Sequence, residues 1–232
     1  MATISDTAVT IMNTALDLAH SQGWAKVTLA AIAAESGLRP DQVFAEFRSK
    51  EAVLAGFARH IDAAVLQEPL ETGGTVRDRI FDLIMRRFDA LAPHRAAIRA
   101  ILRDTMGDPL AGLSGLCAVN RSMALTLEAA GVSASGLLGQ VRVNALAALY
   151  LRTLYDWLQI EDGGSDERIM AQLDKALSRA ERIATSFAGQ RERLAARRQA
   201  RRARRRTGDA EDPAATAAET NATVAAEASE QA

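Results

Sequence analysis

Residues 28–54, TLAAIAAESGLRPDQVFAEFRSKEAVL, constrain the fold of this chain more than any other stretch. Thr28 suits a helix N-cap, and apolar residues follow it at the spacing of a buried helical face. Gly37 ends that helix, Pro40 fits the first turn of a second one, and Ser49 caps a third. The stretch therefore predicts a helix-turn-helix, the motif whose second helix enters the DNA major groove.

The second helix of this motif is short and carries three apolar residues. We expect Val43, Phe44 and Phe47 to form its buried face. Lys50 then lies in the first turn of the third helix, which runs on to about residue 65. That longer helix would connect the motif to the rest of the molecule.

The pattern resembles the DNA-binding domain of the tetracycline-repressor (TetR) family of transcriptional regulators, over residues 7–65. That family's pattern runs T-x-x-x-I-A-x-x-x-G-V, a short recognition helix with an aromatic residue, then F-x-S-K-E-x-x-L. The matching residues are Thr28, Ile32, Ala33, Gly37, Leu38, Phe44, Phe47, Ser49, Lys50, Glu51 and Leu54. The resemblance implies a regulator with an N-terminal DNA reader and a divergent C-terminal sensor domain.

The recognition helix departs from this pattern in its polar residues. Phe44 replaces the usual Tyr, Glu46 stands where His or Tyr is usual, and Asp41 stands where Gly is common. Residues 1–60 also hold six acidic and only five basic side chains. Since DNA affinity depends on neutralising phosphates, this balance is weak for a DNA reader. A working reader is the favoured interpretation, and a retained fold with reduced DNA affinity stays open.

The candidate DNA-contacting residues are Thr28, Arg39, Gln42, Phe44, Arg48 and Lys50. Arg39 and Arg48 would contact phosphate or guanine, and Gln42 would contact adenine or phosphate. Thr28 would cap the first helix of the motif at its backbone N–H groups.

Composition indicates an all-α protein with a well-packed core. Of 232 residues, 48% are hydrophobic and only five are proline. The single cysteine, Cys117, excludes an intrachain disulfide framework. Neither a signal peptide nor an apolar run of about 18 residues is evident, so we expect a cytoplasmic protein without a transmembrane segment.

Apolar spacing predicts helices over residues 6–22, 50–65, 76–91, 95–104, 110–129, 136–158 and 167–187. The polar stretch 67–75 is the best internal boundary. The expected domains are a helix-turn-helix domain (1–49), a connecting helix (50–66), a helical effector-binding and dimerisation domain (76–190), an Arg-rich segment (191–206) and a disordered acidic tail (207–232).

The helix predicted at 136–158 is apolar on nearly every side, so it must be buried in the core or against a partner. With the helix at 166–187 it resembles the antiparallel pair through which the TetR family dimerises as a four-helix bundle, which implies a homodimer. The candidate interface residues are Leu146, Leu149, Leu154, Leu173 and Leu177.

Aromatic and Met residues of the C-terminal region are candidates to line a cavity for a small apolar effector or a lipid. Plain core packing is the competing interpretation. The family resemblance favours a cavity, because TetR-type regulators hold an effector between these helices. The candidate pocket residues are Phe88, Met106, Met123, Tyr150, Tyr155 and Trp157.

The end of the chain divides by charge. Residues 191–206 hold nine arginines and one acid, whereas residues 207–232 hold six acids and no base. The Arg-rich segment is interpreted either as the solvated end of the last helix or as a nonspecific contact with nucleic acid or an anionic membrane surface.

No catalytic or metal-binding pattern is present. The three histidines, His20, His60 and His94, are scattered, and neither a G-x-S-x-G nor a P-loop sequence occurs. We therefore expect no enzyme activity and no cofactor.

A second, looser resemblance leaves an alternative function open. Residues 76–102 and 157–177 look like a ubiquinone-biosynthesis accessory family, which is similar to TetR regulators in fold but binds lipids and has lost the DNA role. The intact spacing of 28–54 favours a ligand-responsive regulator, usually a repressor, that binds a double-stranded DNA operator. The acids of the recognition helix and the very apolar helix at 136–158 favour the lipid-binding accessory protein. Exposure of that helix's apolar face in the monomer would suit contact with lipid or a membrane, whereas its burial in a dimer would suit the regulator.

Overall fold

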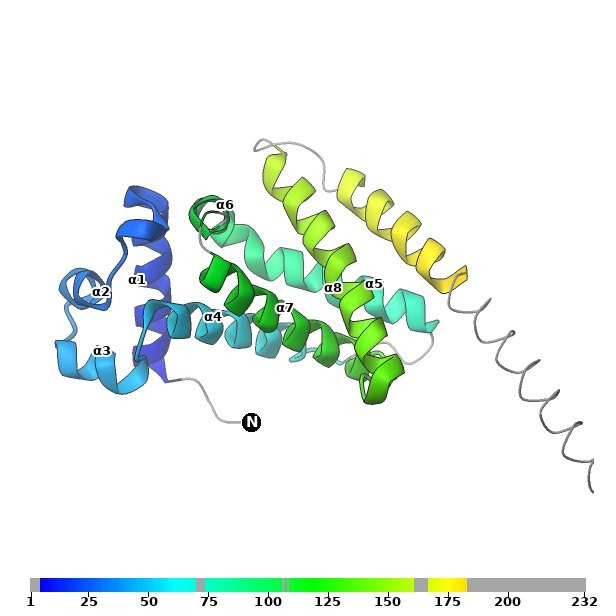
Figure 1. The fold of residues 1–232 in the computed structure, drawn as a ribbon, viewed down its shortest axis with the longest axis horizontal. Helices are drawn as coiled ribbons and strands as arrows, with labels where there is room; N and C mark the ends of the chain where they lie inside the picture. Colours follow the sequence, from blue (N-terminus) through cyan, green and yellow to red (C-terminus); the bar gives the residue numbers. More distant parts are fainter. Residues whose placement is uncertain (1–4, 70–73, 106, 108, 161–166, 183–232) are drawn as a thin grey trace, which may run out of the picture. The chain divides into compact units, whose positions relative to one another are not determined.

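The computed structural model describes residues 5–69, 74–105, 107, 109–160 and 167–182, and the regular elements in these ranges are all helical (Figure 1). This confirms the all-α prediction. The chain divides into two compact units, Met1–Ser178 and Arg179–Ala232. Helices α1 to α8 belong to the first unit. None of the described helices is long and apolar enough to cross a membrane.

The elements follow the sequence expectations closely. They are α1 (Asp6–Gln22), η1 (Trp24–Lys26), α2 (Leu29–Ser36), α3 (Pro40–Glu46), α4 (Lys50–Val65), α5 (Val76–Leu91), η2 (Ala92–His94), α6 (Arg95–Thr105), α7 (Pro109–Ala129) and α8 (Gly136–Gln159). A further helical stretch covers 167–182. The Arg-rich segment, the acidic tail and the predicted end of the last helix lie outside the described residues.

Local capping explains where the N-terminal helices begin and end. The Thr28 hydroxyl accepts a hydrogen bond from the Ala31 N–H at 3.1 Å, and the Ser49 hydroxyl accepts from Ala52 at the same distance. Gly37 ends α2 in the left-handed conformation, with φ of 68°. The three small helices α1, α2 and α3 pack on one another, and α1 also packs on α4. The predicted helix-turn-helix is thus present as α2 and α3.

Gly56 lets α4 approach the end of the recognition helix closely. A Cβ at Gly56 would lie 2.6 Å from a ring carbon of Phe47 and 3.3 Å from Sδ of Met12. Phe47 is itself buried directly after α3. The orientation of α3 on α4 therefore depends on the missing side chain at Gly56.

We expect Gly56→Ala to lower the free energy of unfolding by about 1–3 kcal/mol, because the added methyl group must displace the Phe47 ring in a packed core. Urea denaturation measures this decrease. Gly115→Ala in α7 is the matched control, because nothing lies within 4 Å of its added Cβ. The control should be neutral or stabilising by up to about 1 kcal/mol. A neutral Gly56→Ala would contradict the close approach.

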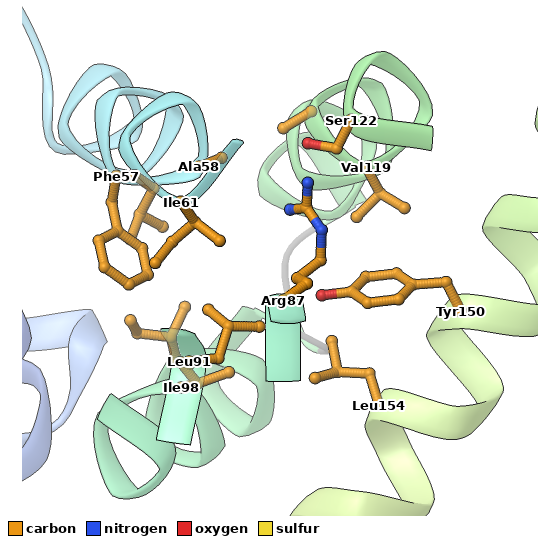
Figure 2. A pocket seen from close by; sticks show the side chains of 13 residues that line it. Phe57, Ala58, Ile61, Arg87, Leu91, Ile98, Val119, Ser122, Tyr150 and Leu154 are labelled. Atoms are coloured by element: carbon orange, nitrogen blue, oxygen red, sulfur yellow. The ribbon is translucent and has the colours of Figure 1, made fainter. Parts of the chain in front are cut away.

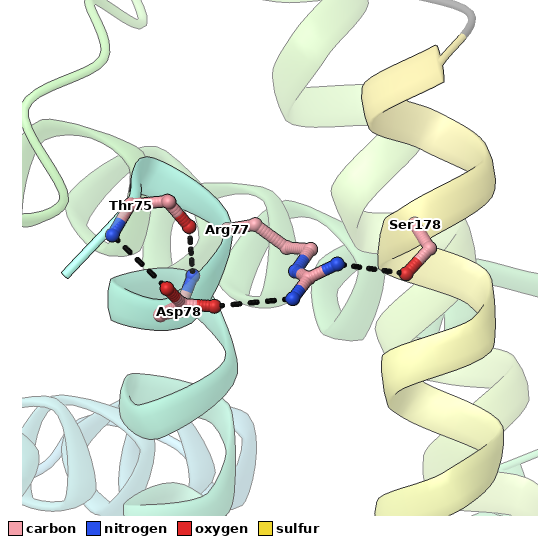
Figure 3. A network of polar contacts seen from close by, with 4 residues as sticks. All are labelled: Thr75, Arg77, Asp78 and Ser178. Carbon is pink, nitrogen blue, oxygen red and sulfur yellow. Dashed lines mark hydrogen bonds and ion pairs between the residues drawn. The ribbon is translucent and has the colours of Figure 1, made fainter.

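The C-terminal part of the unit is built around α5. Helix α4 packs on α5 and α7, and α7 packs on α8. At the start of α5, Thr75 and Asp78 form a capping box, which lowers the pKa of Asp78 chiefly through the Thr75 hydrogen bonds (Figure 3). Arg77 donates to the Ser178 hydroxyl at 3.1 Å and so ties the 167–182 helix to α5.

Helix α8 is only partly buried within one chain. Its middle and C-terminal parts are in the core, but within one chain Leu137 is 91% exposed and Val141 is 64% exposed. Burial in the core of one chain therefore accounts for only part of this helix, and burial of the remainder against a partner stays a prediction. The reason is that the neighbouring helices cover only part of its circumference, and the apolar remainder faces outward.

Candidate DNA-reading helix and effector cavity

Helix α3 presents a polar face with one aromatic residue to the outside. Val43 and Phe47 are buried, but Phe44 is 53% exposed, so its assignment to the buried face is wrong. Because successive residues of a helix point in different directions, the face that buries Val43 against its neighbours leaves Phe44 outside. Arg39, Gln42 and Arg48, the other candidate DNA contacts near this helix, are also exposed.

Both acidic residues of α3 have partners within the protein. Asp41 forms an ion pair with Arg39 at 2.6 Å, with both side chains largely exposed. Glu46 accepts a hydrogen bond from the Ser5 hydroxyl at 2.8 Å, which links α3 to the cap of α1. An exposed ion pair contributes little stability, so Arg39 can exchange Asp41 for a phosphate at small cost.

Three of the candidate DNA contacts also build the motif itself. Thr28 caps α2, and the Gln42 side chain accepts from the backbone N–H of Arg39 at 3.0 Å. Lys50 donates to the carbonyl oxygen of Trp24 at 3.1 Å, and its ammonium lies 5.2 Å from the centre of the Trp24 ring. Their contact with DNA stays a prediction.

A carboxylate of α6 holds the segment between α1 and α2. Asp104 accepts a hydrogen bond from the backbone N–H of Ala25 at 3.1 Å, and this bond is the main cause of the lowered pKa of Asp104. Gly23, with φ of 87°, allows the approach, because a Cβ there would lie 3.0 Å from the Asp104 carboxylate. Helix α6 therefore contacts η1, which it also binds through Asp104, and it packs on α1.

A cavity of about 160 Å³ lies among α4, α5, α6, α7 and α8 (Figure 2). Its walls are mostly apolar: the lining side chains include Phe57, Ile61, Leu91, Ile98, Val119 and Leu154. Two of its residues, Ile98 and Ile101, come from α6, the helix that holds η1. The cavity and the DNA-reading domain therefore share a structural element.

A buried polar cluster borders the cavity, and its members Arg87, Ser122 and Tyr150 are among the lining residues. Arg87 of α5 forms an ion pair with Asp62 of α4, and these side chains are only 5% and 6% exposed. The Ser122 hydroxyl donates to the other carboxylate oxygen of Asp62 at 3.0 Å. Figure 2 shows Arg87 between Ser122 and Tyr150, whose ring centre lies 5.8 Å from the guanidinium carbon. Burial raises the pKa of the Tyr150 hydroxyl, which therefore stays protonated at neutral pH.

The candidate pocket residues are only partly brought together. Tyr150 lines the cavity, and Phe88 packs behind it at 5.8 Å between ring centres. Trp157 packs on Phe88 in turn, and Met123 is fully buried, but neither is among the residues that line the cavity. Tyr155 faces outward. Met106 lies outside the described residues.

Sequence reasoning missed the polar members of the site. Arg87 follows Leu83 by four residues and precedes Leu91 by four, on the apolar face of α5. A charged residue in such a position was the available signal, because buried charges are rare unless they are paired. Its partner Asp62 lies 25 residues away in the sequence and could not be identified from spacing.

Most of the leucines proposed for the dimer interface lie in the core or at the cavity of a single chain. Leu146, Leu173 and Leu177 are buried, and Leu154 lines the cavity. Leu149 is half-buried against the core. The accessible apolar side chains of the same two helices are instead Leu137, Leu138, Val141, Tyr155 and Met170.

Comparison with known proteins supports this architecture. A family model described as bacterial regulatory proteins, tetR family, matches residues 11–56. A TetR transcriptional regulator structure from Nitrosomonas europaea is 24% identical, with a TM-score of 0.62, over 76% of this chain and 99% of that one. A tetR-family regulator from Streptomyces coelicolor is 18% identical, with a TM-score of 0.56, over 82% and 89%. A search of curated proteins finds no significant match.

A helix-turn-helix domain joined to a helical domain with a cavity is an architecture typical of transcriptional regulators that read DNA. This chain carries a TetR-family DNA-binding domain and has the fold of the TetR-family transcriptional regulators. Among the described residues, no group of His, Cys, Asp or Glu side chains is arranged to hold a metal ion.

Proposed function

We propose that this protein is a ligand-responsive repressor that binds a double-stranded DNA operator as a homodimer. The observation that carries the proposal is the dual role of α6, which lines the cavity with Ile98 and Ile101 and holds η1 through Asp104. An effector that occupies the cavity would press on α6. The shift would reach η1 and, through the Lys50–Trp24 contacts, the start of α4.

The other end of α6 is anchored to α8. Arg95 donates to the carbonyl oxygens of Trp157 and Ile160, and its guanidinium lies 4.7 Å from the centre of the Trp157 ring. Arg99 donates to the carbonyl oxygen of Leu158 at 2.8 Å. Since cations stabilise the C-terminal end of a helix, these contacts fasten α6 to the end of α8. A rigid α6 anchored at both ends would transmit a displacement rather than absorb it.

The outward apolar face of α8 supports the homodimer. Large exposed apolar side chains gather at its first turns, and an aromatic side chain follows on the later turns. A second copy of the chain would cover this face and give the two reading helices that a two-part operator needs.

The test is DNA binding by fluorescence anisotropy, with the DNA upstream of the gene titrated at several salt concentrations. A form that ends at residue 190 separates the reader from the Arg-rich segment. Tight, sequence-selective binding by both forms supports the proposal. Binding that is unselective, or that disappears on truncation, would contradict it and favour the lipid-binding accessory function.

Lys50→Ala should weaken binding to every DNA sequence, because it removes one phosphate-neutralising charge per reader and the anchor of η1. The slope of log affinity against log salt should fall by about 0.9 for each phosphate that is no longer neutralised. Arg59→Ala is the matched control: it removes the same charge from α4 about 13 Å further along the helix. A salt slope unchanged from that of the wild type would rule out Lys50 as a phosphate-binding residue.

Asp104→Ala should leave effector affinity intact and reduce the effect of effector on DNA affinity, because the variant frees η1 from α6. The wild-type contact should also depend on pH. Since the pKa of Asp104 is lowered in the fold, its stabilisation is present above the ordinary aspartate pKa and is lost as the pH falls through the lowered pKa. Acid titration of the wild type and of Asp104→Ala, monitored by circular dichroism, measures the pH dependence of stability that the Asp104 contact contributes. An undiminished effector response in Asp104→Ala would exclude this route of coupling.

A further inference from the structure

The cavity has one polar end whose formal charge is zero. The positive charge of Arg87 is matched by Asp62, and both carboxylate oxygens of Asp62 are engaged, one by Arg87 and one by Ser122. Apart from the Tyr150 hydroxyl, the other lining side chains are aliphatic or aromatic carbon. A ligand would therefore meet a paired, already neutral site within an apolar wall.

Hydrogen-bond donors are left over at this polar end. Nε of Arg87 is buried and has no hydrogen-bond partner among the described residues. A buried N–H without a partner costs free energy that an acceptor on a ligand would recover. The protonated Tyr150 hydroxyl interacts with Arg87 and can donate its own proton to the same acceptor. The site is thus built to receive an acceptor atom.

The cavity volume limits the size of the ligand. An apolar cavity of about 150 Å³ in a protein core holds benzene. At about 160 Å³, this cavity matches one six-membered ring with a short substituent, and a long acyl or isoprenoid chain would have to extend out of its open side.

We propose that the effector is a small neutral molecule, about one aromatic ring in size, with a single hydrogen-bond acceptor that meets Arg87 and Tyr150. This inference rests on the proposed function, because it takes the cavity as the effector site. An anion of the same size is disfavoured: Asp62 already balances Arg87, so an added negative charge would be buried without compensation. An apolar molecule of the same shape would leave the Arg87 N–H unpaired.

Three probes of equal heavy-atom count separate these alternatives. Acetophenone carries one neutral acceptor, cumene carries none, and benzoate carries a negative charge. Isothermal titration with the full-length protein, in the absence of DNA, measures each affinity. We expect acetophenone to bind about tenfold more tightly than cumene, since it gains one buried hydrogen bond. Benzoate should bind at least tenfold more weakly than acetophenone.

A pair of variants locates the binding. Ala118 lines the cavity, whereas its neighbour Cys117 is exposed on the same helix. Ala118→Leu should fill the cavity and abolish acetophenone binding. Cys117→Leu adds the same type of side chain outside the cavity and should leave that affinity unchanged. Thermal unfolding of both variants establishes that they are folded.

Each contrary result overturns a stated part of the inference. If benzoate binds more tightly than acetophenone, the ligand is not required to be neutral. If cumene binds as tightly as acetophenone, no hydrogen-bond acceptor is needed. If Ala118→Leu still binds acetophenone, the cavity is not the binding site. If a long-chain lipid presented in vesicles binds tightly and acetophenone does not bind, the proposed ligand size of about one aromatic ring is wrong. These readouts do not involve DNA, so they are distinguishable from failure of operator binding, which would overturn the proposed function.

Discussion

Arg87→Met is expected to lower the free energy of unfolding by about 3–5 kcal/mol, the largest stability change predicted for this chain. The variant keeps much of the side-chain volume but leaves the Asp62 carboxylate buried, with Ser122 as its remaining side-chain hydrogen-bond donor among the described residues. Removing one partner of a buried pair exposes the full desolvation cost of the other. Chemical denaturation, read by circular dichroism, measures the decrease.

The neighbouring arginine provides the control. Arg86 precedes Arg87 in α5 and pairs with Asp82 at 2.9 Å, but this pair is partly exposed, with side chains 21% and 45% accessible. Arg86 also donates to the carbonyl oxygen of Glu68 at 3.0 Å. Arg86→Met should therefore cost less than about 1 kcal/mol. The two substitutions are chemically identical, and the two ion pairs differ chiefly in how deeply they are buried.

The double variant Arg87→Met with Asp62→Leu should recover most of the stability, because it removes the unpaired charge along with its partner. A double variant as unstable as Arg87→Met alone would show that packing, not charge, controls the site. A single variant that is destabilised by less than about 1 kcal/mol would show that the pair is not buried in solution.

Leu137→Glu together with Val141→Glu is expected to convert the proposed homodimer into a monomer and to lower operator affinity about a hundredfold. Both side chains are exposed in the single chain, so the substitutions should not disturb its core. In the dimer they would bury four uncompensated carboxylates at the interface. A monomer also lacks the gain in affinity that comes from two linked readers. Analytical ultracentrifugation and anisotropy measure the two effects.

Leu113→Glu is the control for this pair, since Leu113 is a comparably exposed leucine on α7. It should preserve both the oligomeric state and the operator affinity. A wild-type protein that sediments as a monomer would exclude the homodimer. If the double variant at Leu137 and Val141 is still a dimer, the interface lies on another surface of the protein.

Helix positions were predictable because their signals are local. Thr28, Gly37 and Ser49 act within one helical turn through caps and a left-handed backbone, and the structure confirms all three. The range predicted for the helix at 76–91 agrees with α5. The helix-turn-helix was likewise predictable from residue spacing within 28–54, and the match of a tetR family model to residues 11–56 confirms this prediction.

Side-chain surroundings were not predictable in the same way. Phe44 lies beside Val43 in the chain, yet one is exposed and the other buried, because the neighbouring helices cover only one side of a short helix. Leu146 and Val141 have the same apolar character on one helix and lie respectively in the core and at the surface. Periodicity identifies an apolar face but does not say which neighbour covers it.

The amino-acid order was sufficient for the helix-turn-helix, the helical boundaries and the fold class, since each depends on interactions a few residues apart. The cavity needed the folded chain: Asp62, Arg87, Ser122 and Tyr150 come from four different helices. So did the Asp104 contact with Ala25, which joins residues 79 apart in the sequence. Such contacts depend on how the helices pack, and packing is set by the whole set of side chains rather than by any local pattern.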